Sequence, residues 1–117
     1  MLTLAFAEHF AAEWVHAWNK HDLELILSHY TDDFVMSSPR IVDIVGEATG
    51  TLKGKPAIRA YWEKALTLAP DLYFELVSVF VGTNSVILYY RGVRGLATEV
   101  FFFNDSYKVI QASAHYA

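Results

Sequence analysis

Residues 12–39 read AEWVHAWNKHDLELILSHYTDDFVMSSP, and their pattern predicts a long helix, a break, a short helix, an acidic turn and a strand. Helical spacing places Phe10, Trp14 and Trp18 on one side of the first helix, with Glu13 and His16 on the other. The residues that follow are mostly typical of strands. We therefore expect a helical arm that covers a sheet.

The apolar side of this first helix is unusually aromatic. Phe10, Trp14 and Trp18 follow one another at intervals of four residues, which aligns them along one helix face. Two interpretations fit this stripe: ordinary core packing, or one wall of a ligand cavity. A buried tryptophan also needs a partner for its indole N–H, which gives the stripe a polar requirement.

The next elements follow from local signals. Asp22 is suited to cap a second helix, and the acidic segment 31–33 predicts a turn after it. A strand is expected over 34–38, where Pro39 ends it, followed by an irregular connection over 40–50. A short strand at 51–53 precedes a helix over 54–69, which Pro56 opens. The second helix has its apolar positions at Leu23, Ile26, Leu27 and Tyr30.

The C-terminal part of the sequence predicts four strands, at 72–81, 85–93, 96–104 and 107–116. Glycine- and asparagine-containing segments separate them, as is typical of antiparallel hairpins. Helices followed by meandering strands indicate an α+β domain with its helices on one face of the sheet. We expect residues 1–117 to form one such domain.

The strands are apolar on both faces, and 54% of all residues are hydrophobic. A sheet with one solvated face alternates more cleanly than segments such as YFELVSVFV do. We therefore expect one face to meet the helices and the other to form a homodimer. The alternative is a monomer with an exposed apolar sheet.

Charge and composition exclude several functions. The net charge of −4 and the lack of a basic run argue against nucleic-acid binding. No apolar run approaches the roughly 18 residues of a membrane span, and no signal peptide is recognisable. The chain has no cysteine, so thiol chemistry is excluded and a cytoplasmic location is expected. The five histidines form no metal-ligand pattern, no phosphate-binding loop is present, and we expect neither metal nor cofactor.

Several motifs in this order resemble the nuclear-transport-factor-2-like superfamily, in particular its SnoaL-like and ketosteroid-isomerase-like branch. They are HDLE at 21–24, YTDDF at 30–34, GKPAIRAYW at 54–62 and the last hairpin. The resemblance covers nearly the whole chain. It implies a curved, mainly antiparallel mixed sheet, wrapped by three helices of the N-terminal half into a cone with an internal pocket. It also implies a dimer formed through the sheet.

The resemblance allows the catalytic positions of ketosteroid isomerases to be compared one by one. The general-base aspartate of these enzymes corresponds here to Ser38, which cannot act as a carboxylate base. The two tyrosine positions correspond to Trp14 and Trp62, and the oxyanion carboxylic acid corresponds to Glu99. Only one of these positions keeps an ionisable group. Steroid isomerisation by that mechanism is therefore not expected.

Glu99 is the residue for which the sequence gives the most specific functional prediction, because it is the only charged residue in the segment LATEVFFF. Burying a carboxylate is costly unless it is paired or neutral. We predict that Glu99 faces an apolar cavity, opposite Ala112, with a raised pKa and a tentative catalytic role. Two alternatives are an ion pair with Arg91 or Arg94, and exposure near a sheet end. The predicted cavity walls are Trp14, Trp18, Met36, Ser38, Trp62, Tyr90 and Tyr116.

Two functions fit these observations. The first is a pocket protein that binds a small apolar or aromatic molecule and catalyses proton transfer, as an isomerase, cyclase or dehydratase does. The second is a non-catalytic ligand-binding or dimerisation module that has lost the catalytic residues of the family. The sequence identifies neither the ligand nor the reaction, because fold alone does not determine function.

Overall fold

The computed structural model describes residues 1–117, which form four helices and one six-stranded sheet. The order of helices and strands along the chain is the predicted one, with one additional helix. The helices are α1 (Leu4–Asn19), α2 (Leu23–Leu27), α3 (Pro39–Val45) and α4 (Lys55–Leu68). The strands are β1 (Tyr30–Ser37), β2 (Thr51–Lys53), β3 (Glu75–Val81), β4 (Ser85–Gly92), β5 (Gly95–Phe103) and β6 (Val109–Tyr116).

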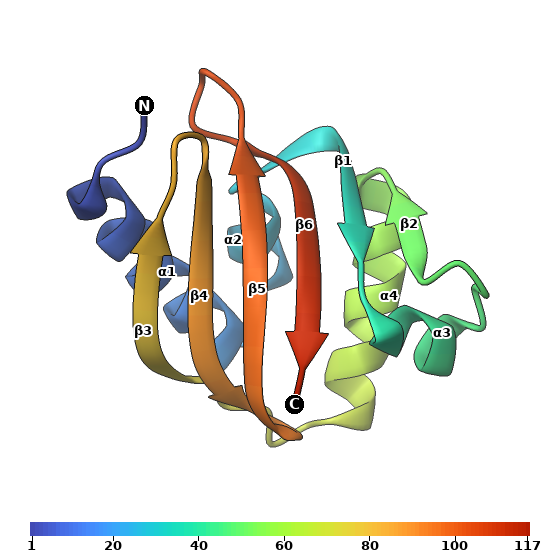
Figure 1. Ribbon diagram of the computed structural model, residues 1–117. Helices are drawn as coiled ribbons and strands as arrows, with labels where there is room; N and C mark the ends of the chain where they lie inside the picture. The colour runs from blue at the N-terminus through green and yellow to red at the C-terminus, as the bar shows by residue number, and fades with distance from the viewer.

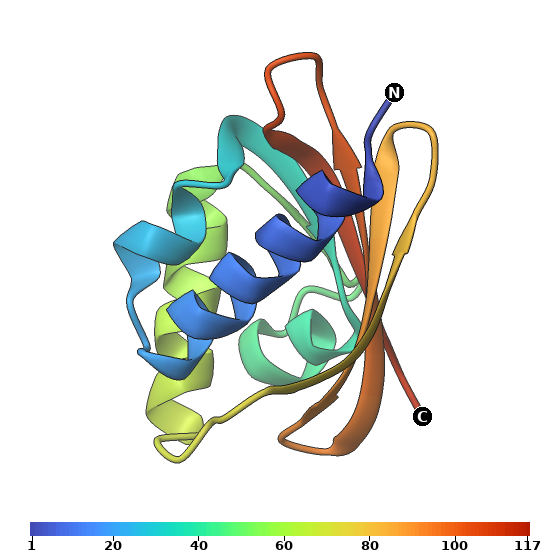
Figure 2. The same cartoon turned by 90° about the vertical axis from the view of Figure 1, so that its left-hand side faces the viewer.

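The strands lie in the order β2-β1-β6-β5-β4-β3, as Figure 1 shows. All neighbouring pairs are antiparallel except β1 and β6, which are parallel. Helices α1, α2 and α4 cover one face of the curved sheet, and the opposite face carries no other element (Figure 2). The fold is thus the predicted mixed α+β architecture. No helix combines the length and the apolar character that crossing a membrane requires.

Helix α1 follows the amphipathic pattern of its sequence. Thr3 caps it by accepting the backbone N–H of Phe6 at 3.1 Å. The aromatic stripe is buried against the sheet, where Trp14 is 1% exposed. At the end of the helix, the side chain of Asn19 exchanges two hydrogen bonds with the backbone of Phe74, at 3.0 and 2.6 Å. These bonds fix the segment before β3 against the end of α1, which places Phe74 beside the tryptophans.

The prediction of an irregular connection over residues 40–50 was wrong in its first half, where α3 forms. Ser38 caps this helix by accepting the N–H of Arg40 at 3.1 Å, and Pro39 occupies its first turn. Gly46 then ends it in the left-handed conformation, with φ of 75°. The helix buries Ile41 and packs beside α4.

The acidic segment 31–33 was also interpreted wrongly, because it lies within β1 and is not a turn. Asp32 and Asp33 are exposed there, and the pairing of β1 with β6 shifts register between Tyr30 and Val35. Tyr30, predicted for the apolar face of the second helix, is instead the buried first residue of β1. Residues 72–74, predicted as strand, precede β3.

Candidate functional site

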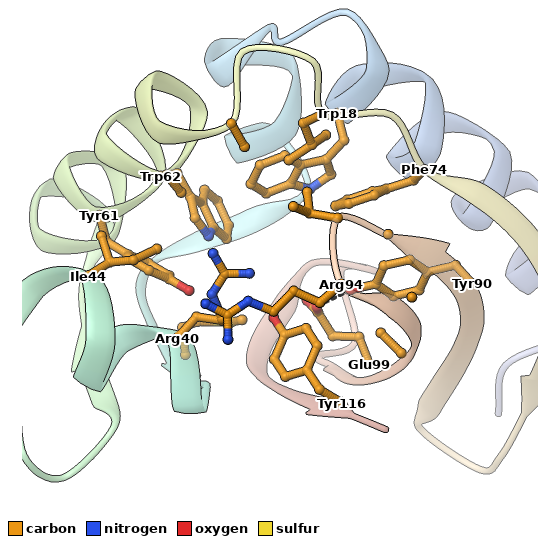
Figure 3. Close-up of a pocket in the computed structure, with 18 of the residues that line it drawn as sticks. Trp18, Arg40, Ile44, Tyr61, Trp62, Phe74, Tyr90, Arg94, Glu99 and Tyr116 are labelled. Atoms are coloured by element: carbon orange, nitrogen blue, oxygen red, sulfur yellow. Dashed lines mark hydrogen bonds between the residues drawn. The ribbon is translucent and has the colours of Figure 1, made fainter.

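A cavity lies between the helices and the concave face of the sheet (Figure 3). It contains about 680 Å³ of space not filled by atoms, its open mouth included. Most of the wall is apolar, and its residues are Trp14, Trp18, Met36, Arg40, Ile44, Tyr61, Trp62, Ala65, Ala69, Leu72, Phe74, Tyr90, Gly92, Val93, Arg94, Gly95, Ala97, Glu99 and Tyr116.

Strand β5 carries Glu99 into this cavity by simple alternation. Ala97, Glu99 and Phe101 all face the helices and are buried, whereas their neighbours are half-buried on the other face. Across the sheet, Glu99 lies opposite Leu88 of β4 and Ala114 of β6. The small methyl group of Ala114 leaves room beside the carboxyl group.

The predicted partner of Glu99 was Ala112, which instead pairs with Phe101. The difference of two positions arises in the hairpin, where the register shifts between Phe102 and Phe103. There the Asn104 side chain accepts the backbone N–H groups of Ser106 and Lys108, both at 3.0 Å, and orders the loop. Because the offset is even, the side chains keep the predicted face.

Glu99 is 4% exposed and has no cationic partner. Arg91 instead lies 3.6 Å from Glu75, and Arg94 lies 3.9 Å from Asp43. The one polar contact of Glu99 is the hydroxyl of Tyr90, which donates to Oε1 at a long 3.5 Å. Neither alternative position of Glu99, paired with an arginine or exposed, agrees with this arrangement.

Burial raises the pKa of Glu99 to about 8, because the charged form loses its hydration, and the Tyr90 hydrogen bond opposes this only in part. Roughly nine in ten Glu99 side chains therefore carry a proton at pH 7. Burial likewise raises the pKa values of Tyr30 and Tyr90, and a negative Glu99 raises them further. Near neutral pH the polar groups in the interior are thus neutral hydrogen-bond donors.

The aromatic wall comes from α1, α4 and the segment before β3. Trp14 stacks on Phe74 with centroids 5.4 Å apart, and Trp18 meets Trp62 edge to face at 5.2 Å. The indole N–H of Trp14 donates to the Tyr30 hydroxyl at 3.1 Å. The indole N–H of Trp18 is buried without a partner. The indole N–H of Trp14 therefore has an acceptor within the protein, and the indole N–H of Trp18 has none.

The exposed wall residues Val93, Arg94 and Tyr116 place the mouth of the cavity at the turn between β4 and β5, beside α3. Figure 3 shows the side chains of Arg40, Arg94, Tyr61 and Tyr116 around this opening. Burial raises the pKa of Tyr61 and that of Tyr116, and the positive charge of Arg40 opposes both shifts. Ser38, which was predicted to line the cavity, is buried behind the wall, with its hydroxyl 3.4 Å from that of Tyr116.

The structure therefore brings together seven of the residues named from the sequence: Trp14, Trp18, Met36, Trp62, Tyr90, Glu99 and Tyr116. Sequence reasoning missed the contribution of α3, which adds Arg40 and Ile44 to the wall. A signal was present, since the pair Ser38-Pro39 is a typical helix start and Gly46 a typical helix end. Nothing local distinguished Arg94 from other turn residues.

Two further observations restrict the chemistry of the site. Glu99 is the only carboxylate among the wall residues, and no histidine lines the cavity. No group of three histidine or acidic residues anywhere in the structure is arranged to hold a metal ion. The ionisable groups of the cavity are thus one carboxylic acid, three tyrosine phenols and two guanidinium groups.

Comparison with known proteins agrees with the fold. A SnoaL-like protein of unknown function from Burkholderia thailandensis E264 is 53% identical, over 98% of this chain and 97% of that chain, with a TM-score of 0.94. A protein of unknown function from Burkholderia pseudomallei K96243, described as NTF2-like, is 15% identical over 96% and 91%, with a TM-score of 0.76.

SalBIII is described as an epoxide hydrolase/cyclase-like enzyme with a role in pyran ring formation in the polyether salinomycin. It is 17% identical over 95% of this chain and 90% of that chain, with a TM-score of 0.72. At this identity the likeness supports the fold alone. No curated protein is similar in sequence to this chain. The model of the SnoaL-like domain matches residues 11–109, and the chain therefore belongs to the SnoaL-like family.

Proposed function

We propose that the protein binds a small apolar or aromatic molecule in the cavity and that Glu99 acts on it as a protonated acid. One observation carries the proposal. A carboxyl group is buried in an aromatic cavity with no cation beside it, which is costly and serves no evident structural purpose. Buried ionisable groups with shifted pKa values in a cleft are typical of functional sites.

The chemistry that suits this group is proton transfer. A carboxylic acid in an apolar site donates a strong hydrogen bond, or a proton, to an oxygen that becomes negative during reaction. With a pKa of about 8, Glu99 exists in both forms near neutral pH, as a general acid or base requires. Isomerisation, cyclisation and dehydration all contain such a step.

The alternative is a binding module without catalysis, and two observations favour it. The cavity has no second carboxylate or histidine to act as the partner of Glu99. In addition, Ser38, Trp14 and Trp62 occupy the positions that carry ionisable groups in ketosteroid isomerases. In this case Glu99 only anchors a polar atom of the ligand.

Substituting Glu99→Gln separates the two functions. A library of aromatic ketones and lactones is first screened for binding, and each compound that binds is then assayed for turnover. If Glu99 transfers protons, the variant keeps binding and loses turnover by about 100-fold or more. Glu8→Gln, on the exposed side of α1, is the matched control. Unchanged turnover in Glu99→Gln, or no turnover of any compound that binds, contradicts catalysis by Glu99.

We also propose that the outer face of the sheet forms a homodimer. Phe80, Ile87 and Val100 lie side by side across β3, β4 and β5 on the face away from the helices. Phe80 is 54% exposed and Ile87 36% exposed, so the row remains accessible in the single chain. Exposed apolar patches of this kind mark interaction surfaces.

Light scattering after gel filtration tests the dimer. The wild-type protein is expected at about twice the chain mass of 13.2 kDa, and the double variant Phe80→Glu/Ile87→Glu at the mass of one chain. Leu68→Glu, on the exposed end of α4, removes an even more exposed apolar side chain elsewhere and is expected to leave the dimer intact. A monomeric wild-type protein at micromolar concentration contradicts the proposal.

A further inference from the structure

The mouth of the cavity carries a concentration of positive charge that the apolar interior does not explain. Arg40 and Arg94 are the only cationic residues in the wall, and they come from different elements, α3 and the turn between β4 and β5. Figure 3 shows both guanidinium groups in the space between Tyr61 and Tyr116. The net charge of the chain is −4, so this pair of cations is a local feature.

Arg40 has no acidic partner in the protein, and Arg94 has only one weak partner. The Nε of Arg40 is buried and has no hydrogen-bond partner, and no acidic side chain lies within ion-pair distance of its guanidinium group. Arg94 has one carboxylate neighbour, Asp43 at 3.9 Å, and both side chains are more than half exposed. A pair at that distance and exposure contributes little. A buried guanidinium nitrogen without a partner is costly, and a ligand anion would provide the missing partner.

A second unpartnered donor lies deeper in the same cavity. Trp18 is 5% exposed, and its Nε1 is buried without an acceptor although the side chain lines the cavity. An indole N–H only donates, so it requires an oxygen or nitrogen acceptor that the protein does not supply. Glu99, mostly protonated near neutral pH, adds a second interior donor. The interior thus offers donors and no charge, and the mouth offers two cations.

We infer that the ligand is an apolar, aromatic molecule with an anionic group at one end, held by Arg40 and Arg94, and an acceptor oxygen inside, held by Trp18. This inference rests on the proposed function and specifies its substrate class. A guanidinium group binds the two oxygens of a carboxylate in parallel, which fixes the orientation of the ligand. The anion would remain at the solvent side, and the uncharged end would reach Glu99. The same pair of charges disfavours cationic ligands.

Two fluorescent dyes that differ by one charged group test the inference. 8-Anilinonaphthalene-1-sulfonate carries an anion, and N-phenyl-1-naphthylamine has the same aromatic frame without it. The wild-type protein is expected to bind the sulfonate about tenfold more tightly or better, because hydrogen bonds to charged groups reach that strength. Unlabelled 2-naphthoate should displace the sulfonate dye, and 2-naphthamide should do so at least tenfold less well.

Variants of the two arginines test whether these residues cause the tighter binding of the sulfonate dye. Arg40→Gln/Arg94→Gln should weaken sulfonate binding about tenfold or more and leave binding of the neutral dye within about twofold. Binding of the neutral dye shows that the cavity of the variant is intact. The matched control is Arg91→Gln, which removes an arginine that lies beside Glu75 and outside the cavity wall. Ala69→Trp, at the cavity wall near the end of α4, should weaken both dyes and thereby place them in the cavity.

The outcomes separate this inference from the proposed function. Equal affinity of the wild-type protein for the two dyes, or sulfonate binding that is unaffected in the arginine double variant, overturns the inference of an anionic ligand. The cavity would then still be a site for apolar molecules, provided that Ala69→Trp excludes the dyes. Failure of the wild-type protein to bind either dye contradicts both the inference and the proposed binding function.

Discussion

Helix α1 and strand β5 form both ends of the space between the helix and the sheet, but the side chains that fill the two ends differ. At one end, here called the filled end, Phe10 of α1 packs edge to face on Phe101 and Phe103 of β5, each with centroids 5.0 Å apart. At the other, the hollow end, Trp14 and Trp18 continue the same helix stripe and line the cavity.

The difference lies in the inward positions of β5, read along the strand. Phe103 and Phe101 fill the space opposite α1, and the next inward positions are Glu99 and Ala97. Ala114, opposite Glu99, is also small. One strand therefore changes from large apolar side chains to an acid and an alanine at a single step. The cavity results from this loss of side-chain volume, while the helix stripe remains continuous.

The largest expected effect is on stability at the filled end. Phe101→Ala should lower the free energy of unfolding by about 4 kcal/mol, because it removes a fully buried ring and leaves a void. The matched control is Tyr73→Ala, just before β3 and outside the proposed dimer surface, where the ring is 70% exposed and the cost should stay below about 1 kcal/mol. Urea denaturation measures both. Equal costs would show that the filled end is not the core.

The second effect is a pH dependence of the folding stability, which arises from Glu99 at the hollow end. The pKa of Glu99 is about 8 in the folded protein, against about 4.3 in the unfolded chain. The folded state therefore holds the proton more tightly, and this stabilisation is fully present below pH 4 and lost as the pH rises to 8. Between pH 5 and pH 7 the loss amounts to about 2.5 kcal/mol.

The variant Glu99→Gln isolates this contribution because it has no proton to lose. Between pH 5 and pH 7 the free energy of unfolding of Glu99→Gln, relative to that of the wild-type protein, should rise by this same amount. The contributions of all other ionisable groups cancel in the difference. Denaturation midpoints measured at half-unit pH steps give the difference. A difference that stays constant from pH 5 to pH 8 means that Glu99 titrates normally.

A pair of alanines tests the contrast in packing directly. Ala112 is fully buried opposite Phe101 at the filled end, and Ala97 lines the cavity. Ala112→Leu should cost about 1–3 kcal/mol because no space exists for the added atoms. Ala97→Leu should stay within about 1 kcal/mol because the cavity accepts the larger side chain. The reverse order in thermal or urea denaturation would contradict the position of the cavity.

The smallest expected effect is a change in the pKa of Glu99 when Tyr90, its one hydrogen-bond partner, loses its hydroxyl group. The Tyr90 hydroxyl donates to Glu99 and lowers the pKa of the carboxyl group relative to burial alone. Tyr90→Phe should therefore raise the pKa of Glu99 above about 8. Carbon NMR of labelled glutamate side chains follows the titration of this group. A lowered pKa in Tyr90→Phe would show that the long contact is not a hydrogen bond to the carboxylate.

The face on which a strand residue lies was easier to predict from sequence than its partner in the neighbouring strand or the loops around the cavity. Glu99 lies on the cavity side although its predicted partner was wrong, because a register error of two positions leaves the alternation along β5 unchanged. Tyr90 of β4, predicted for the cavity wall, likewise faces inward and is buried. Periodicity identifies the face of a strand residue reliably, because side chains alternate strictly between the two faces of the sheet.

The parts that the sequence did not predict depend on turns and irregular segments. The exact partner of Glu99 depended on the Asn104 loop, whose internal hydrogen bonds set the offset between β5 and β6. The cations at the mouth depended on the short helix α3 and on the turn at Arg94. Such segments meet only in the folded chain, and no periodic pattern marks which of their side chains face a cavity.

The parallel pairing of β1 with β6 has a consequence for how the protein folds. Met36 pairs with Ala112, so two segments from distant parts of the chain form neighbouring strands in the middle of the sheet. Loop-closure entropy opposes such contacts, and chains that depend on them fold slowly compared with helical bundles. The β1–β2 pair and the β3–β6 meander can each form locally. Only their joining completes the cavity, so refolding kinetics should show Trp14 and Trp62 entering their final environment in the same late step as β1 docks on β6.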